Sequence, residues 1–100
     1  MKLGRVCGTV VCTRKDERLA GLKLLIVEEL TIESKPTGAF VVAVDAVGAG
    51  AAETVLLVAG SSARLTERTL NKPVDAAIAA IVDEVVLDRD RDRDRGRCGQ

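Results

Sequence analysis

The sequence of 100 residues carries 15 basic and 15 acidic side chains, has a formal net charge of zero, and contains no histidine. This balance excludes the overall basic field that nucleic-acid binding normally requires, and the lack of histidine removes the commonest general base. Hydrophobic residues make up 47% of the chain but aromatic residues only 1%, which is Phe40 alone. We therefore expect a single domain that buries excess aliphatic surface by association with copies of itself.

Targeting signals and cysteines indicate the compartment. No apolar run approaches the roughly 20 residues of a membrane-spanning helix, and residues 1–5 are not followed by the apolar core and cleavage site of a signal peptide. The three cysteines, Cys7, Cys12 and Cys98, are odd in number and have no framework spacing. We expect Cys7 and Cys12 to be small buried side chains of a reducing, cytoplasmic compartment, and Cys98 to be an exposed thiol.

The first predicted strand covers residues 2–13 and is apolar on both faces. Its two faces carry, respectively, Val6, Val10 and Cys12, and Leu3, Cys7 and Val11. A barrel strand turns one face to its own core, so something else must cover the other face. Gly4 and Gly8 share one face of the predicted strand, where they permit a close backbone approach or a sharp bend.

The following segments alternate between short connections and strands. They are, in order, a polar connection (14–18), a second strand (21–32), a turn with Pro36 and Gly38 (33–38), a third strand (39–45) and a fourth strand (54–59). After Gly60, Ser61 or Ser62 can cap a short helical turn that runs through Thr66.

Residues 74–86 fit two patterns. Helical spacing relates Val74, Ala77, Ile78 and Ile81, whereas strand alternation relates Ile81, Asp83, Val85 and Leu87. We interpret this segment as a short helix, begun by Pro73, that leads into a fifth strand. The alternating Asp and Arg residues beyond it contain no apolar side chain and predict a disordered tail. The predicted fold is mainly β, a five-stranded OB-like barrel with one or two short helices over residues 1–87, followed by a tail over 88–100.

Two glycine-containing stretches approach known catalytic or nucleotide-binding motifs without matching them. The run from Gly48 to Glu53 begins like a dinucleotide fingerprint, but Glu53 stands where the third glycine is required. Ser62 is not in a nucleophile elbow, because Arg64 occupies the place of the necessary glycine. A capped turn is the preferred interpretation there, with room for a small anion on its backbone N–H groups.

The spacing of the acidic residues and of the cysteines does not fit a calcium or a zinc site. The aspartates of residues 88–94 do not form a calcium loop, because Arg93 or Arg95 stands at the glycine position. Three scattered cysteines without histidine offer no zinc ligand set. Asp45 is better explained as a turn residue than as one of an acid/base pair. We expect no catalytic residue, no metal and no cofactor.

Several of these stretches, in this order, resemble a known family. They are Gly8-Thr9-Val10-Val11 with a Thr13-Arg14-Lys15 ending, Gly21-Leu22-Lys23-Leu24-Leu25-Ile26-Val27, residues 44–50, residues 60–64, Pro73-Val74-Asp75-Ala76-Ala77-Ile78 and Ile81-Val82-Asp83. As an ordered set over about residues 1–87, they resemble the bacterial microcompartment vertex proteins, the EutN/CcmL family. The Asp/Arg tail with Cys98 departs from the family pattern.

The resemblance implies a structural role and not an enzyme. It implies an OB-like barrel that assembles as a cyclic homopentamer and closes the vertices of a polyhedral shell, within a microcompartment of the cytoplasm. The implied partners are hexagonal shell proteins of the flat facets. The implied facet contact is Gly48, Ala49 and Gly50. The ring and its axial opening would be built in part by Gly60, Ser61, Ser62, Ala63 and Arg64.

Two other classes stay open at this point. An OB-type binding module for single-stranded nucleic acid or a small ligand needs stacking aromatics and a basic groove, and Phe40 is the one aromatic available. An enzyme or ligand module would have to use Cys7, Cys12 or Ser62, and reactivity of either cysteine in the folded state would favour it.

Overall fold

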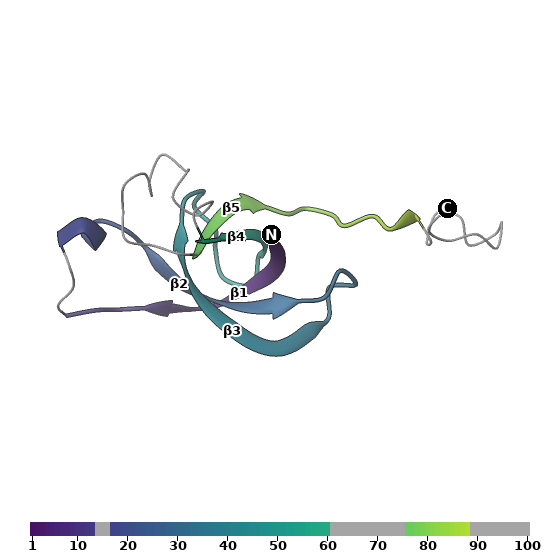
Figure 1. Ribbon diagram of the computed structural model, residues 1–100, viewed down its shortest axis with the longest axis horizontal. Helices are drawn as coiled ribbons and strands as arrows, with labels where there is room; N and C mark the ends of the chain where they lie inside the picture. The colour runs from purple at the N-terminus through teal and green to yellow at the C-terminus, as the bar shows by residue number, and fades with distance from the viewer. Residues whose placement is uncertain (14–16, 61–75, 89–100) are drawn as a thin grey trace.

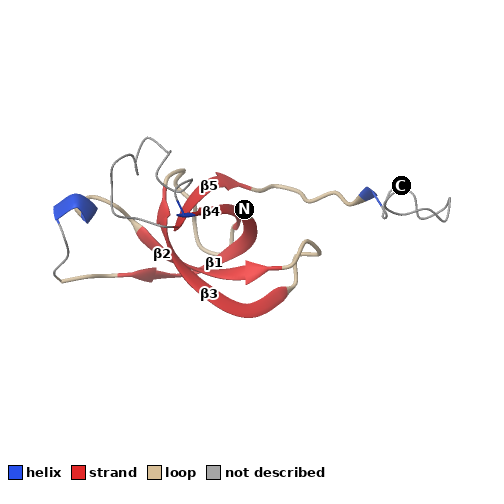
Figure 2. Cartoon of the chain, in the orientation of Figure 1, coloured by secondary structure: helices blue, strands red, loops and turns tan. Residues whose placement is uncertain are grey.

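The computed structural model describes residues 1–13, 17–60 and 76–88 (Figure 1). Five strands close a single barrel in the order β1-β2-β3-β5-β4 (Figure 2). The strands are β1 Lys2–Val10, β2 Leu24–Leu30, β3 Pro36–Asp45, β4 Thr54–Ala59 and β5 Ala76–Ile81. The predicted five-stranded barrel is confirmed.

Four of the five strand contacts are antiparallel, and one parallel contact closes the barrel between β3 and β5. The β2–β3 turn lies earlier than predicted, because the Thr31 N–H donates to the Lys35 carbonyl at 2.8 Å. Ser34 takes a positive φ of 65° within this turn. Pro36 and Gly38 therefore belong to the start of β3, where proline is tolerated as the first residue of a strand.

Helix is almost absent from the described residues. The 3₁₀ turn η1, Glu17–Leu19, overlaps the end of the predicted polar connection, and the single residues Gly60 and Asp88 are also helical, at the limits of the described ranges. The predicted cap at Ser61 or Ser62 and its helical turn through Thr66 lie outside the described residues, as does the tail beyond Asp88.

The helix predicted after Pro73 is wrong over Ala76–Ile81, which form β5. Ala77 and Ile78 are completely buried, because β5 is inserted between β3 and β4 and has both of its edges paired. Long-range pairing of this kind overrides the local helical spacing of apolar residues. The strand predicted beyond Ile81 is also wrong, since residues 82–87 have no regular structure.

The barrel interior is filled by aliphatic side chains from all five strands and by one loop residue. Its buried cluster is Val6, Leu25, Val27, Ala43, Ala49, Val55, Leu57, Ala76 and Ile78. Gly4 allows the closest approach in this interior, because a Cβ atom there would lie 2.3 Å from Val27 Cγ1. The close approach predicted for this glycine is thus confirmed.

A β-bulge at Cys7 changes which residues of β1 face outward. Val6 pairs with Val27 and Gly8 pairs with Ile26, so Cys7 is an extra residue on β1. The bulge puts Gly4 on the inner face and Gly8 on the outer face, which corrects the prediction that they share one face. The predicted burial of Cys7 and Cys12 is also wrong, since both are free and exposed in the single chain. The Cys7 thiol donates a hydrogen bond to the Ile26 carbonyl at 3.5 Å.

Candidate assembly surfaces

The loop between β3 and β4 is organised by one buried carboxylate. Asp45 is 5% exposed, and its Oδ1 accepts hydrogen bonds from the N–H groups of Val47, Gly48 and Ala49 at 3.0, 2.9 and 3.1 Å. One carboxylate oxygen therefore satisfies three successive backbone donors and turns the chain back toward the barrel. The predicted turn role of Asp45 is confirmed.

The same loop is fastened to β1 at its far end. The Val6 N–H donates to the Glu53 carbonyl at 3.0 Å, and the Ala52 N–H donates to the Val6 carbonyl at 2.8 Å. The Glu53 side chain accepts a hydrogen bond from the Gly50 N–H. With Asp45 at one end and Val6 at the other, residues 46–53 form a braced loop at one mouth of the barrel.

The three residues implied as a facet contact, Gly48, Ala49 and Gly50, differ in their exposure to solvent. Ala49 is 2% exposed and packs inside the barrel core, whereas Gly48 is open, with a positive φ of 78° and no atom within 4 Å of where a Cβ would lie. Gly50 is half-buried. Val47, at 40% exposed, is the large apolar side chain that this loop presents to solvent. Of the second implied set, Gly60 is described, and Ser61, Ser62, Ala63 and Arg64 lie outside the described residues.

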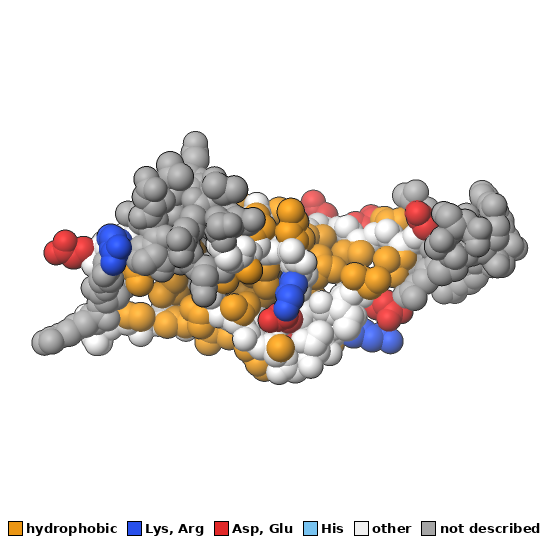
Figure 3. All heavy atoms as spheres, in the orientation of Figure 1, with side chains coloured by type: hydrophobic (Ala, Val, Ile, Leu, Met, Phe, Trp, Pro, Cys, Tyr) orange, Lys and Arg blue, Asp and Glu red, His pale blue; other side chains and the backbone are white. Residues whose placement is uncertain are grey.

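The outer face of β1–β2–β3 is apolar and uncovered by the described residues. Ile26 of β2 lies opposite Gly8 on one side and Val42 on the other. Val42 is 48% exposed. Hydrophobic side chains form a broad band across the visible face of the barrel (Figure 3). An exposed apolar surface of this kind on a small domain marks an interaction site. The second apolar face of the first predicted strand likewise needs another surface to cover it.

Phe40 extends this outer face but does not make it a base-stacking platform. It is 59% exposed and lies opposite Glu28 of β2. An acidic neighbour repels the phosphate backbone, and single-stranded nucleic-acid sites combine aromatic side chains with a positive groove.

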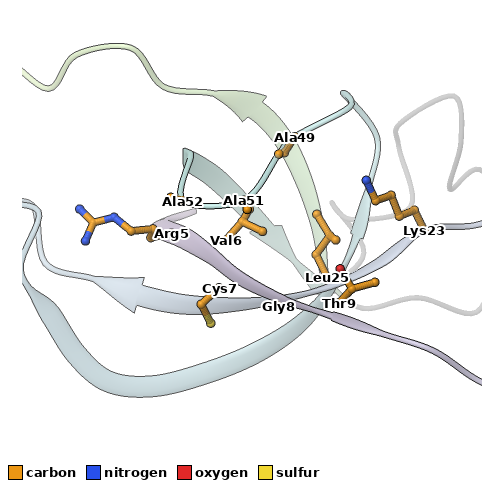
Figure 4. Close-up of a pocket in the computed structure, with 11 residues that line it drawn as sticks. Arg5, Val6, Cys7, Gly8, Thr9, Lys23, Leu25, Ala49, Ala51 and Ala52 are labelled. Atoms are coloured by element: carbon orange, nitrogen blue, oxygen red, sulfur yellow. The ribbon is translucent and has the colours of Figure 1, made fainter.

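A groove of about 430 Å³ runs between β1 and the braced loop. Its apolar floor includes Val6 and Leu25, and its rim is formed by the small residues of the loop. Arg5 extends at one end and Lys23 at the other (Figure 4). Neither cation forms an ion pair with any residue that the structure describes. The groove was not predicted, because a bulge and a loop bring its residues together and neither leaves a periodic signal in the sequence.

The described residues offer no cluster of metal ligands. Within residues 1–13, 17–60 and 76–88, no three His, Cys, Asp or Glu side chains lie close enough to hold a metal ion. In those same ranges, no helix is long and apolar enough to cross a membrane. The surfaces described above therefore offer shape, apolar area and charge for contacts between proteins.

Comparison with known proteins gives consistent matches over nearly the whole described chain. The family model "Ethanolamine utilisation protein EutN/carboxysome" matches residues 1–83. The bacterial microcompartment shell vertex protein EutN of Salmonella typhimurium is 50% identical over 86 residues, which are 86% of this chain and 87% of that protein. The carboxysome shell vertex protein CcmL of Thermosynechococcus vestitus is 44% identical over 88 residues, which are 88% of this chain and 89% of that protein.

A solved structure gives the corresponding match in three dimensions. The GrpN pentameric microcompartment shell protein from Rhodospirillum rubrum superposes with a TM-score of 0.79 at 49% sequence identity. The match covers 86% of this chain and 98% of that one.

Proposed function

The chain belongs to the EutN/CcmL family, and from this membership we propose that it forms the homopentamer that closes the vertices of a bacterial microcompartment shell. The observation that carries the proposal is the likeness to the pentameric shell protein GrpN, which extends over 98% of that chain at 49% identity. The protein is a structural component of the shell and not an enzyme. The EutN and CcmL proteins that it resembles are shell vertex proteins.

The apolar outer face of β1–β2–β3 supports assembly into a ring. Ile26 and Val42 lie side by side on this face, and Val42 is 48% exposed. A neighbouring copy in a head-to-tail ring covers such a face on every subunit and leaves none exposed. This contact distinguishes the proposal from a monomeric OB-type binding module, which would leave the face in water.

The proposed partners of the ring are the hexagonal shell proteins of the flat facets. We assign this contact to the exposed residues Val47 and Gly48 of the braced loop, and not to the buried Ala49. Small side chains let two backbones approach closely without the entropic cost of fixing long side chains. The segment from Gly60 to Arg64 stays a prediction for the axial opening.

The mass in solution tests the ring. One chain has a mass of 10.6 kDa, and five copies give about 53 kDa. Native mass spectrometry at micromolar protein is expected to give the pentamer mass. A stable species of one chain would overturn the ring and return the binding-module function to consideration.

Co-expression with facet proteins tests the loop contact. Val47→Glu puts a charge on the exposed loop, and its expected result is a pentamer of normal mass that no longer closes shells, seen by electron microscopy as open or elongated assemblies. Lys35→Glu, on the β2–β3 turn, is the matched control and is expected to close shells normally. Closed shells from Val47→Glu would contradict the assignment of the loop to the facet contact.

A further inference from the structure

We propose that the segment after β5 of one protomer, residues 83–88, docks in the groove between β1 and the braced loop of the next copy. We refer to this segment as the arm. The inference rests on the proposed homopentamer and goes beyond it by naming the two surfaces that meet. The occupant is a second copy of this chain.

Among the described residues, the last backbone hydrogen bond between the barrel and the chain that leads into the arm is made by Val82. The Val82 N–H donates to the Thr54 carbonyl at 2.8 Å, and beyond this bond residues 83–87 have no regular structure and run away from the barrel (Figure 1). Val85 and Val86 on the arm are 37% and 46% exposed. An extended segment of this length reaches about 20 Å. The arm is therefore a segment whose central valines are not buried by the described residues of its own subunit.

The groove has an open strand edge along one wall. The pairing of β4 with β1 ends at Arg5, and Val6 makes the last backbone bonds to the braced loop. In the part of the chain that the structure describes, no strand continues this edge along Gly8 and Val10. An unpaired edge next to an apolar floor is the usual acceptor of an added extended segment.

The charges of the two surfaces are complementary in sign and in order. The arm reads Asp83-Glu84-Val85-Val86-Leu87-Asp88, with acidic residues on both sides of three apolar ones. The groove has Arg5 at one end, Lys23 at the other and an apolar floor between them. None of these five charged residues forms an ion pair with another described residue. Docking pairs acids with cations at each end and buries the apolar centre.

The arm belongs in a neighbour's groove and not in its own. No arm residue lines the groove of the same chain. A patch on one side of a subunit that fits a different patch on the next subunit is a heterologous contact, and such a contact closes into a ring when the rotation fits. The arm and the groove thus provide the two different patches that a cyclic pentamer requires.

Cross-linking through Cys7, a groove residue, tests the docking directly. The full chain carries Cys12→Ser and Cys98→Ser, and Val85→Cys and Val86→Cys are introduced separately because adjacent positions of an extended segment face opposite sides. After diamide oxidation, at least one of the two is expected to give a ladder of linked chains, from two to five, on denaturing gels. Ile32→Cys, on the β2–β3 turn and 66% exposed, is the control and is expected to give no ladder above background.

Native mass spectrometry of the same samples distinguishes failure of the arm contact alone from failure of the pentameric ring. A pentamer whose arm variants give no more linked chains than Ile32→Cys overturns the arm contact and leaves the ring intact. A disulfide formed within single chains also overturns it. A mass of one chain throughout overturns the ring and the arm contact together.

A charge exchange tests the order of the pairing. Arg5→Glu with Lys23→Glu is expected to raise the dissociation constant of the ring by about two- to fivefold for each lost ion pair, the range of exposed pairs. Adding Asp83→Lys, Glu84→Lys and Asp88→Lys to this double variant reverses the charges at both ends of the arm and is expected to recover most of the loss. Lys35→Glu, outside the groove, is expected to leave the dissociation constant unchanged. Equal weakening by the groove variant and by Lys35→Glu would overturn the pairing.

Discussion

The two halves of β1, before and after the bulge at Cys7, serve different purposes. From Leu3 to Arg5 the strand is paired on both edges, with β2 and with β4, and Gly4 and Val6 face the core. Beyond the bulge at Cys7, the strand pairs only with β2 among the described residues, and its outward residues Gly8 and Val10 are half-buried. One half of the strand holds the barrel together, and the other half is available to a neighbouring chain.

This difference shows that apolar content alone does not tell core from interface. Val6 and Val10 are the same residue type four positions apart, yet Val6 is 4% exposed and Val10 is half-buried. The bulge reverses the alternation of faces between them, because two residues of β1 stand opposite one of β2. Substitutions on the two sides of the bulge should therefore affect different properties, either the stability of the barrel or its assembly.

The largest effect on the barrel is expected from Gly4→Val. A Cβ at this position would lie 2.3 Å from Val27 Cγ1 and 3.1 Å from Leu57 Cδ1, and Val27 is fully buried. Overpacking of this severity is expected to lower the free energy of unfolding by about 3 kcal/mol. Urea denaturation at fixed protein concentration measures the loss. Gly8→Ala is the control across the bulge, where the Cβ would lie 3.2 Å from the flexible tip of Ile26; an equal loss there would contradict the two-half description.

The second largest effect is expected from Asp45→Ala. The substitution leaves three N–H groups of the loop without their common acceptor, and the donor of Ala49 is buried. Loss of hydrogen bonds to a charged acceptor is expected to cost about 2 kcal/mol. Hydrogen exchange is expected to speed up at residues 47–49 and not in the paired half of β1. Asp45→Asn keeps one acceptor oxygen, so a loss as large as that of alanine would argue against the carboxylate as the organiser of the loop.

Much of the fold could be predicted from alternation, and the failures have physical causes. β4 matches its predicted range, because Thr54–Ala59 is a short run of β-branched and aliphatic residues bounded by loop residues on both sides. The helix prediction fails at β5, because alanine-rich apolar runs satisfy both periods and only the pairing with β3 and β4 decides between them. The bulge at Cys7 has no signature of its own in the sequence, so the faces of β1 could not be assigned beyond Val6.

The assembly surfaces could be predicted in kind but not in detail. The excess of apolar residues indicates an uncovered face, and the outer face of β2 and β3 provides it. The glycine loop lies where its residues predict a loop, but its central residue Ala49 packs in the core, because the three hydrogen bonds to Asp45 fold the loop inward. The groove with Arg5 and Lys23 depends on contacts between segments far apart in sequence and has no local signal.

Val42→Lys tests whether the ring is assembled through the outer face of β1–β2–β3. It is expected to change the free energy of unfolding less than Gly4→Val or Asp45→Ala does. Val42 is 48% exposed on the outer face, so a lysine there is expected to change the free energy of unfolding of the single chain by no more than about 0.5 kcal/mol. The expected result is a folded species of one chain, 10.6 kDa, in place of the pentamer. Mass and circular dichroism together measure this. A pentamer of unchanged mass would argue that the ring uses another face.

The smallest effect is expected at the boundary between the two halves of β1. Ala52 donates its N–H to the Val6 carbonyl while holding a φ of 66°, a conformation that costs a non-glycine residue about 1–2 kcal/mol. Ala52→Gly removes this strain but adds freedom to the unfolded chain, a loss of about 0.4–1 kcal/mol. The net result is expected to be a gain of about 0.5 kcal/mol in unfolding free energy, with the ring unchanged. A marked destabilisation, or loss of the ring, would mean that the alanine methyl group contributes a contact, and would extend the assembly half of β1 into the braced loop.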